Sequence, residues 1–128
     1  TLVKPNALEA AELTGRPVGT PEEALAAARA LDGVPYVAIS LGAAGALLAH
    51  DGRGWLATPP PIRERNPVGA GDSLVAGMVW GLSRGDPLEA LRWGVACGAA
   101  AAARDGTAVG TRDEVEALAR QVQVRPLV

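Results

Sequence analysis

The stretch "NPVGAGDSLVAGM", residues 66–78, combines two glycines that flank an alanine, an aspartate directly after them and the start of an apolar helical pattern. Glycines let a ligand approach a backbone turn, and a helix N-terminus presents unpaired N–H groups with a partial positive charge. In such a turn Asp72 or Ser73 can cap the helix, or Asp72 can act as a base that faces the ligand. The motif therefore predicts a phosphate-binding turn and leaves both roles of Asp72 open.

Two common glycine-rich phosphate motifs do not fit this stretch. A Walker loop has a lysine and a hydroxyl residue after its second glycine, whereas the only lysine of this chain is Lys4. A dinucleotide-binding turn follows an apolar strand and has a third glycine three residues after the second. Here "RERNPV" precedes the turn and Leu74 occupies the place of that glycine, so the class of reaction stays open.

A second turn with backbone groups for a phosphate follows the apolar run at residues 34–41. Its candidate groups are the hydroxyl of Ser40 and the backbone N–H groups of Gly42, Ala43 and Gly45. An ordinary turn between strands has the same composition, so this alternative remains. His50, next to a predicted hairpin turn, is expected to be solvated.

Asn6 and Glu9 have the spacing of a capping box, in which a side chain before the helix and an acid three residues later satisfy each other's backbone N–H groups. The same spacing recurs in the pairs Thr20/Glu23, Asp86/Glu89 and Thr111/Glu114. These residues by themselves therefore indicate four helix starts rather than a metal site.

The elements that position these residues alternate between helices and strands. Prolines at the first helical position begin helices at Pro21 and Pro87, and Gly33 is expected to cap the end of the second helix. The stretch at residues 66–78 is predicted to become a helix with Leu74, Met78 and Leu82 on one face. A last helix is predicted over about residues 112–121, and the helix from Pro87 extends to about residue 104. Residues 34–41 predict a buried strand, and residues 45–60 predict a hairpin that turns at residues 51–54. This order predicts an α/β fold with helices covering a mainly parallel sheet.

The composition is that of one globular domain, with 128 residues, 48% hydrophobic residues and a formal net charge of -2. Phenylalanine is absent, so alanine, valine and leucine must fill the core and the helices must pack closely. Interspersed acids and bases argue against a nucleic-acid or membrane-surface partner. With no signal-peptide pattern, no long apolar run and Cys97 as the lone cysteine, we expect a cytoplasmic protein.

Three motifs, in order, resemble the ribokinase-like (PfkB) family of carbohydrate kinases. The segments "VKPNALEAAELTG", "VAISLGAAGALL" and "NPVGAGDSLVAGMVWGL" are similar to its NxxE region, its phosphate-binding strand–turn–strand and its GAGD signature. With the "VGT" loop and the closing "VQVRPL", they are most similar to the branch of 1-phosphofructokinase and tagatose-6-phosphate kinase. The resemblance implies that residues 1–128 are the C-terminal, nucleotide-binding portion of a ribokinase-like fold. We therefore expect a fragment that lacks the N-terminal sugar-binding part and the β-sheet lid.

The resemblance also implies the reaction, which is ATP-dependent phosphoryl transfer to a hydroxyl of a phosphorylated ketose. Asp72 is implied as the catalytic base, and the N–H groups of Gly69, Ala70 and Gly71 are implied as an anion hole. Asn6 and Glu9 are implied to help hold Mg²⁺ through water, a role compatible with capping.

Further contacts implied by the resemblance concern ATP and a second cation. The ATP phosphates would be held near Lys4, Ser40, Gly42, Ala43 and Gly45. Cys97 begins a stretch of small residues, 97–103, that is similar to the wall beside which the family seats adenine, although close-packed core has the same composition. Some members bind a monovalent cation such as K⁺ through loops equivalent to residues 66–68 and 106–111.

Three other functions remain open at this stage. The chain can be part of another ribokinase-like sugar or nucleoside kinase, or an ATP-binding fragment without catalysis of its own. It can also be a structural remnant that buries an exposed sheet edge against a second copy, giving a homo-oligomer.

Overall fold

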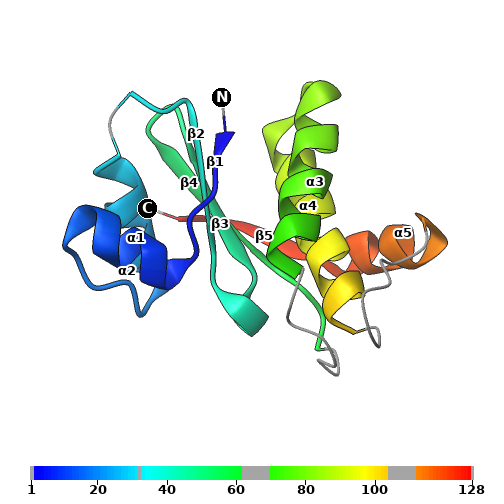
Figure 1. Ribbon diagram of the computed structural model, residues 1–128. Coiled ribbons are helices and arrows are strands. Elements are labelled where there is room, and N and C mark those ends of the chain that lie inside the picture. Colours follow the sequence, from blue (N-terminus) through cyan, green and yellow to red (C-terminus); the bar gives the residue numbers. More distant parts are fainter. Residues whose placement is uncertain (1, 32, 62–69, 104–111, 128) are drawn as a thin grey trace. The chain divides into compact units, whose positions relative to one another are not determined.

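The computed structural model describes residues 2–31, 33–61, 70–103 and 112–127 (Figure 1). The chain divides into two compact units, residues 1–56 with 125–128, and residues 57–124. Each unit carries a different part of the predicted site, and each is described separately.

The strands form a five-stranded sheet in the order β1-β2-β3-β4-β5, which belongs to the first unit except for residues 57–58 of β4 and 123–124 of β5. The strands span Leu2–Val3, Tyr36–Ser40, Ala46–His50, Arg53–Thr58 and Gln123–Leu127. Strands β1 and β2 are parallel, whereas β2 and β3 are antiparallel, with Tyr36 opposite His50 and Ser40 opposite Ala46. Asp51 and Gly52 join β3 to β4, both with positive φ (53° and 76°), as a two-residue hairpin turn requires.

The predicted α/β layering and hairpin are therefore present, but the sheet is mixed rather than mainly parallel. The physical reason is the length of the connections. The segment between β1 and β2 is long enough for a parallel crossover, because it contains α1 (Ala7–Thr14) and α2 (Pro21–Arg29), whereas residues 41–45, which join β2 to β3, are too few for one. Strand β5 lies in a segment that was predicted only as a tail. It is the last strand in the sheet order, a position in which a proline such as Pro126 is tolerated because an edge strand has no neighbour on one side.

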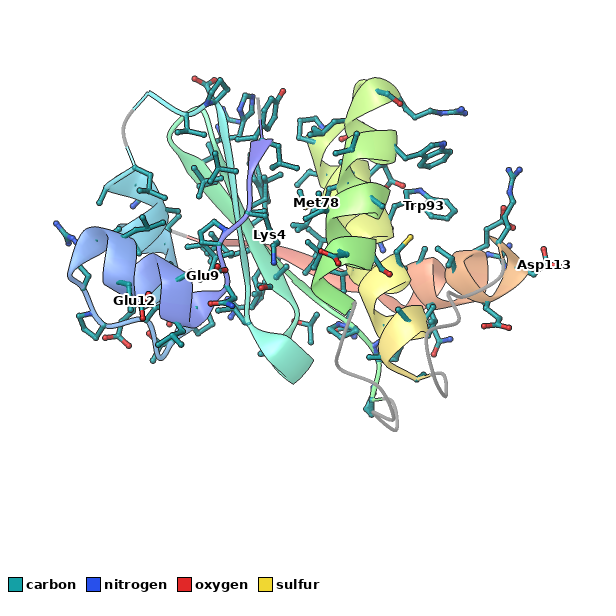
Figure 2. The ribbon with its side chains drawn as sticks, in the orientation of Figure 1. Lys4, Glu9, Glu12, Met78, Trp93 and Asp113 are labelled. Carbon is teal, nitrogen blue, oxygen red and sulfur yellow. The ribbon has the colours of Figure 1, made fainter. Side chains whose placement is uncertain are left out.

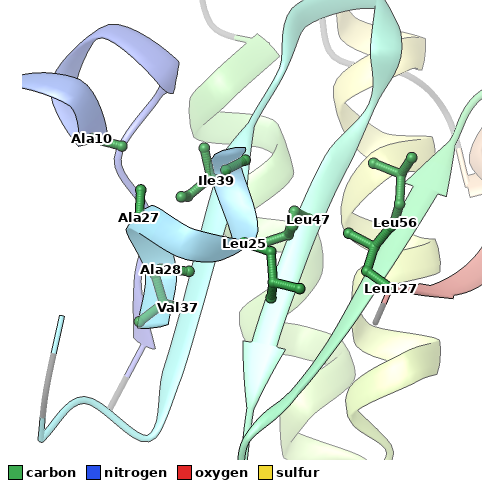
Figure 3. Close-up of a cluster of buried hydrophobic side chains, with 10 residues drawn as sticks. Ala10, Leu25, Ala27, Ala28, Val37, Ile39, Leu47, Leu56 and Leu127 are labelled. Atoms are coloured by element: carbon green, nitrogen blue, oxygen red, sulfur yellow. The ribbon is translucent and has the colours of Figure 1, made fainter. Parts of the chain in front are cut away.

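The core of the first unit lies between the sheet and helices α1 and α2 (Figure 3). Ile39 and Leu47 contribute from the strands and are fully buried, each worth about 1.5–3 kcal/mol of apolar transfer free energy. The helices contribute mainly alanines, with Leu25 the one large side chain of the cluster from this layer. This composition confirms the close approach of helix and sheet that the shortage of aromatic residues predicts.

Local capping explains where these helices begin and end. Pro21 and Pro87 occupy first helical positions, as predicted. The prediction that Gly33 caps α2 is wrong, because the helix ends at Arg29 and Ala30 is the C-cap. The N–H groups of Ala30 and Leu31 donate to carbonyls three residues earlier, which tightens the last turn before Gly33 is reached.

The second unit contains three helices, α3 (Ala70–Ser83), α4 (Pro87–Ala102) and α5 (Arg112–Gln121). Residues 84–86 join α3 to α4, which pack against each other along their lengths (Figure 1). Arg92 on α4 donates from Nη1 to the carbonyls of Ala119 (3.2 Å) and Val122 (2.6 Å) and so closes the C-terminal end of α5. Among the described residues, no helix has the length and apolar character needed to cross a membrane.

Candidate functional site

The carboxyl ends of the parallel strands β1 and β2 bring two of the predicted motifs together. Leu2 and Val3 pair with Tyr36 and Val37, and an isolated bridge between Asn6 and Ser40 continues this register. The N–H group of Ser40 also donates to the carbonyl of Pro5 over 3.3 Å. Asn6 and Ser40, 34 residues apart in the sequence, therefore lie side by side at the carboxyl ends of β1 and β2, the end of the sheet at which α/β folds bind ligands. This end of the two strands, with Asn6 and Ser40, is called the β1–β2 edge below.

The turn that follows Ser40 has a conformation that requires its glycines. Residues Gly42–Ala44 form a short 3-10 helix, and φ is +60° at Gly42 and +102° at Gly45. The N–H groups of Gly42 and Ala43 precede the first hydrogen bond of this helix and have no acceptor within it. The N–H of Gly45 donates to the carbonyl of Gly42 over 3.0 Å, which closes the turn.

Asn6 and Glu9 form a complete capping box at the start of α1. The Asn6 side chain accepts from the Glu9 N–H (2.8 Å), and Glu9 Oε1 accepts from the Asn6 N–H (2.9 Å). Both residues are exposed, and the hydrogen bonds that form the capping box use only one of the two carboxylate oxygens of Glu9. The cap predicted from spacing is thus confirmed, and it leaves Glu9 Oε2 for another contact.

The donors at this edge suit Mg²⁺ only in a water-rich form. Within the described residues, no cluster of three or more His, Cys, Asp or Glu side chains could hold a metal ion. Mg²⁺ in phosphoryl-transfer sites keeps several waters and takes one or two carboxylates together with substrate phosphates, so Glu9 fits such a site. Half-buried Lys4 lies in the segment between β1 and α1 (Figure 2), which adds a positive charge to the same segment of chain.

The predicted turn at residues 69–72 leads directly into α3. The helix begins at Ala70, so exposed Asp72 and half-buried Ser73 lie inside its first turns and not at the cap position, contrary to the capping alternative. Gly69 lies outside the described residues. The N–H groups of Ala70 and Gly71, together with that of Asp72, belong to the first turn, where an α-helix offers no internal acceptor. An anion is favoured there, as it is at any exposed helix N-terminus.

Cys97 lies on α4 against α3 and is half-buried. A Cβ placed on Gly77 would lie 2.9 Å from Cys97 Sγ, so the two helices are in close contact at this point. Burial raises the pKa of the Cys97 thiol. Residues Ala99–Ala102 are buried, so this part of the stretch 97–103 is closely packed.

His50 makes contacts that the sequence did not predict. His50 is only half-exposed; its Nδ1 lies 2.8 Å from the carbonyl of Pro35 and its ring stacks on Tyr36, with centroids 4.1 Å apart. The expectation of a solvated histidine was therefore wrong. Because Tyr36 and His50 are direct partners across β2 and β3, only the strand register reveals the pair. The loops predicted to bind K⁺, residues 66–68 and 106–111, lie outside the described residues.

Comparison with known proteins agrees with the motif order. The family model for pfkB family carbohydrate kinases matches residues 1–114. The chain is 36% identical to 1-phosphofructokinase of Escherichia coli and 38% identical to that of Bacillus subtilis, covering 98% of this chain and 41% and 42% of those proteins. It therefore spans about two fifths of the length of these relatives.

A solved structure gives the same result in three dimensions. Phosphofructokinase-2 from Escherichia coli, in complex with substrates and products, superposes with a TM-score of 0.84 at 34% identity, covering 93% of this chain and 40% of that one. The same enzyme is also known in complex with potassium and as a tetrameric inhibited form. From the matched family model and these relatives, the chain belongs to the pfkB family of carbohydrate kinases.

Proposed function

We propose that the chain is the C-terminal, nucleotide-binding portion of an ATP-dependent kinase that phosphorylates a hydroxyl of a phosphorylated ketose. The observation that carries this proposal is the ordered match of this chain to 1-phosphofructokinases over 98% of its length. In this proposal the sugar-binding part and the lid belong to a longer protein of which residues 1–128 form the C-terminal portion.

The transfer step is assigned to the first turn of α3. Phosphoryl transfer depends on positioning and on stabilising charge that spreads over the phosphoryl oxygens. The N–H groups of Gly69, Ala70 and Gly71 would face that charge as an anion hole. Asp72, in the first turn and exposed, would accept the proton of the acceptor hydroxyl. The support for these roles is the helix start at Ala70 together with the family motif.

Holding ATP is assigned to the edge formed by β1 and β2. Ser40 and the turn formed by Gly42, Ala43 and Gly45 would contact the phosphates, and Lys4 would add positive charge. Mg²⁺, when bound, neutralises charge on the phosphates, and Asn6 with Glu9 would orient its waters. Cys97 and the small residues after it would border the adenine.

Two further proposals depend on relatives alone. A K⁺ site would be formed by residues 66–68 and 106–111, by analogy with the potassium complex of phosphofructokinase-2. A homo-oligomer is proposed because the same relative has a tetrameric form.

An assay of the whole protein tests the acceptor. ADP release would be followed with ATP and, in turn, fructose 1-phosphate, tagatose 6-phosphate, fructose 6-phosphate, unphosphorylated sugars and adenosine. We expect the highest kcat/KM with a phosphorylated ketose. Turnover only with adenosine or an unphosphorylated sugar would instead favour another ribokinase-like kinase.

Calorimetric titration of residues 1–128 with ATP and Mg²⁺ tests the nucleotide half on its own. Saturable binding supports the assignment of the β1–β2 edge. If this chain binds ATP but the whole protein transfers no phosphoryl group, the function is that of a binding module. If it binds no ATP, the structural alternative is favoured.

A further inference from the structure

The contact between α3 and α4 is closer than side chains normally allow. A Cβ on Gly77 would lie 2.9 Å from the Cα of Gly94 and 2.9 Å from the carbonyl oxygen of Trp93. A Cβ on Gly81 would overlap the backbone of Ala90. Such distances are shorter than real Cβ contacts, so glycine is required at these positions for the helices to approach this closely.

Gly94 meets α3 at the turn that follows Asp72. A Cβ at Gly94 would lie 2.9 Å from the carbonyl oxygen of Leu74 and 3.4 Å from the backbone nitrogen of Met78, and it would overlap the Met78 side chain. In an α-helix the carbonyl of residue 74 accepts from the N–H of residue 78, so Gly94 lies against this helical turn. Leu74 is two residues beyond Asp72 in the same helix.

We propose that Gly94 is a positioning residue for the transfer step, because its missing side chain sets the distance of the first two turns of α3 from α4. This inference rests on the proposed role of Asp72. Gly94 itself touches no reacting group; it acts through Leu74 and Met78 on the place of Asp72 and of the N–H groups beside it.

The surroundings leave the added methyl group little room. Met78 is fully buried and Leu74 is 6% exposed, so neither lies at a free surface into which it could move aside. The 2.9 Å distance to the Leu74 oxygen is about 0.5 Å short of an ordinary contact at 3.4 Å, and a backbone atom yields only if the helix moves. A misplacement of about 1 Å in an active site can cost about 10²-fold, so a shift of about half that predicts a loss of about tenfold.

The test compares Gly94→Ala with Gly81→Ala in the whole protein. Both substitutions add one methyl group to the same helix pair, but Gly81 is nine residues beyond Asp72, about 13 Å along the helix. We expect Gly94→Ala to lower kcat about tenfold with the KM for ATP changed less than twofold. Gly81→Ala should lower the Tm at least as much and kcat much less.

The two tryptophans of this helix pair report its geometry independently of activity. Trp80 on α3 and Trp93, next to Gly94, pack edge to face with centroids 5.2 Å apart (Figure 2 labels Trp93). Their near-ultraviolet circular dichroism should change in Gly94→Ala if α3 moves. A changed spectrum with wild-type kcat would overturn the proposal, as would losses of kcat in the two variants that simply follow their Tm.

A milder variant covers the case in which Gly94→Ala does not fold. Met78→Leu conserves volume and changes the side chain that lies over Gly94, typically at a cost below about 1.5 kcal/mol. A decrease in kcat with unchanged KM for ATP is expected, and unchanged kcat overturns the proposal. Failure of the proposed function is distinguishable, because the wild-type protein would then show no phosphoryl transfer. Failure of the proposed role of Asp72 is distinguishable because Asp72→Asn would then keep the wild-type turnover.

Discussion

Glu9 has two separable properties, a hydrogen bond that caps α1 and a negative charge that would face Mg²⁺. Glu9→Gln keeps an acceptor oxygen for the Asn6 N–H and removes the charge, whereas Glu9→Ala removes both. Glu12→Gln is the matched control, because it removes the same charge from the same helix one turn further on (Figure 2).

The structure gives different magnitudes for the two properties. The hydrogen bond from the Asn6 N–H to Glu9 Oε1, 2.9 Å long, contributes about 0.5–1.5 kcal/mol, so Glu9→Ala should destabilise the first unit by about that amount. Glu9→Gln loses only the interaction with the helix dipole, about 0.3–1 kcal/mol. A carboxylate and Mg²⁺ about 5 Å apart, joined through one water, attract by about 1.7 kcal/mol at a dielectric constant of about 80. Because each 1.4 kcal/mol corresponds to a factor of ten, Glu9→Gln should raise the Mg²⁺ concentration for half-maximal effect by about 10- to 20-fold.

The assay is a Mg²⁺ titration at fixed ATP, read as nucleotide binding by residues 1–128 and as turnover of the whole protein. Thermal unfolding of the same variants separates capping from metal binding. Glu12→Gln should leave the Mg²⁺ midpoint within about twofold of wild type, because its charge lies further away. Equal midpoints in Glu9→Gln and wild type would refute the metal role and leave Glu9 as a cap alone.

Two predictions concern the second unit. Arg92→Met keeps the apolar stem but removes the donor to the carbonyls of Ala119 and Val122, so the free energy of unfolding in urea should fall by about 1–3 kcal/mol. The control is Arg120→Met, which changes an exposed arginine of α5. Equal urea midpoints in the two variants would contradict the role of Arg92 in closing the end of α5. Burial raises the pKa of the Cys97 thiol, so less thiolate is present at a given pH. Alkylation of Cys97 at pH 8 should therefore be slower than alkylation of a small free thiol until urea unfolds the chain. An alkylation rate in the folded chain equal to that of the free thiol would contradict this prediction.

Helix starts could be predicted from sequence because capping is chemistry between near neighbours. The Asn6 and Glu9 pair closes as a full box, whereas Glu23 accepts from the N–H of Gly19 and not from that of Thr20. Asp86 also caps as predicted, accepting from the N–H groups of Leu88 and Glu89. The spacing thus identifies the start of a helix more reliably than the full set of hydrogen bonds.

Features that depend on pairing between distant segments were not predictable in the same way. The mixed sheet and β5 follow from which strands meet, and the short segment around Pro126 carries no local signal strong enough to establish a strand. The bridge between Asn6 and Ser40 has the same origin, because only the parallel register places these residues together. The candidate residues could be identified from the sequence, but only the strand register shows which of them are neighbours.

Gly94 shows a further limit of sequence reasoning. The composition predicts close packing in general, since small residues must fill the core. Which glycine meets which backbone atom depends on the alignment of α3 with α4, and no pattern within either helix gives that alignment. The contact of Gly94 with the turn after Asp72 therefore emerges only from the fold.

The most direct test of the account is the turnover of Asp72→Asn beside that of Asp113→Asn. Both aspartates are exposed in the first turn of a helix, so both variants lose the same favourable interaction with a helix dipole. The account predicts that Asp72→Asn lowers kcat about 10²- to 10⁴-fold with ATP binding retained, while Asp113→Asn keeps kcat near wild type. Wild-type turnover in Asp72→Asn would contradict the role of Asp72 as the base.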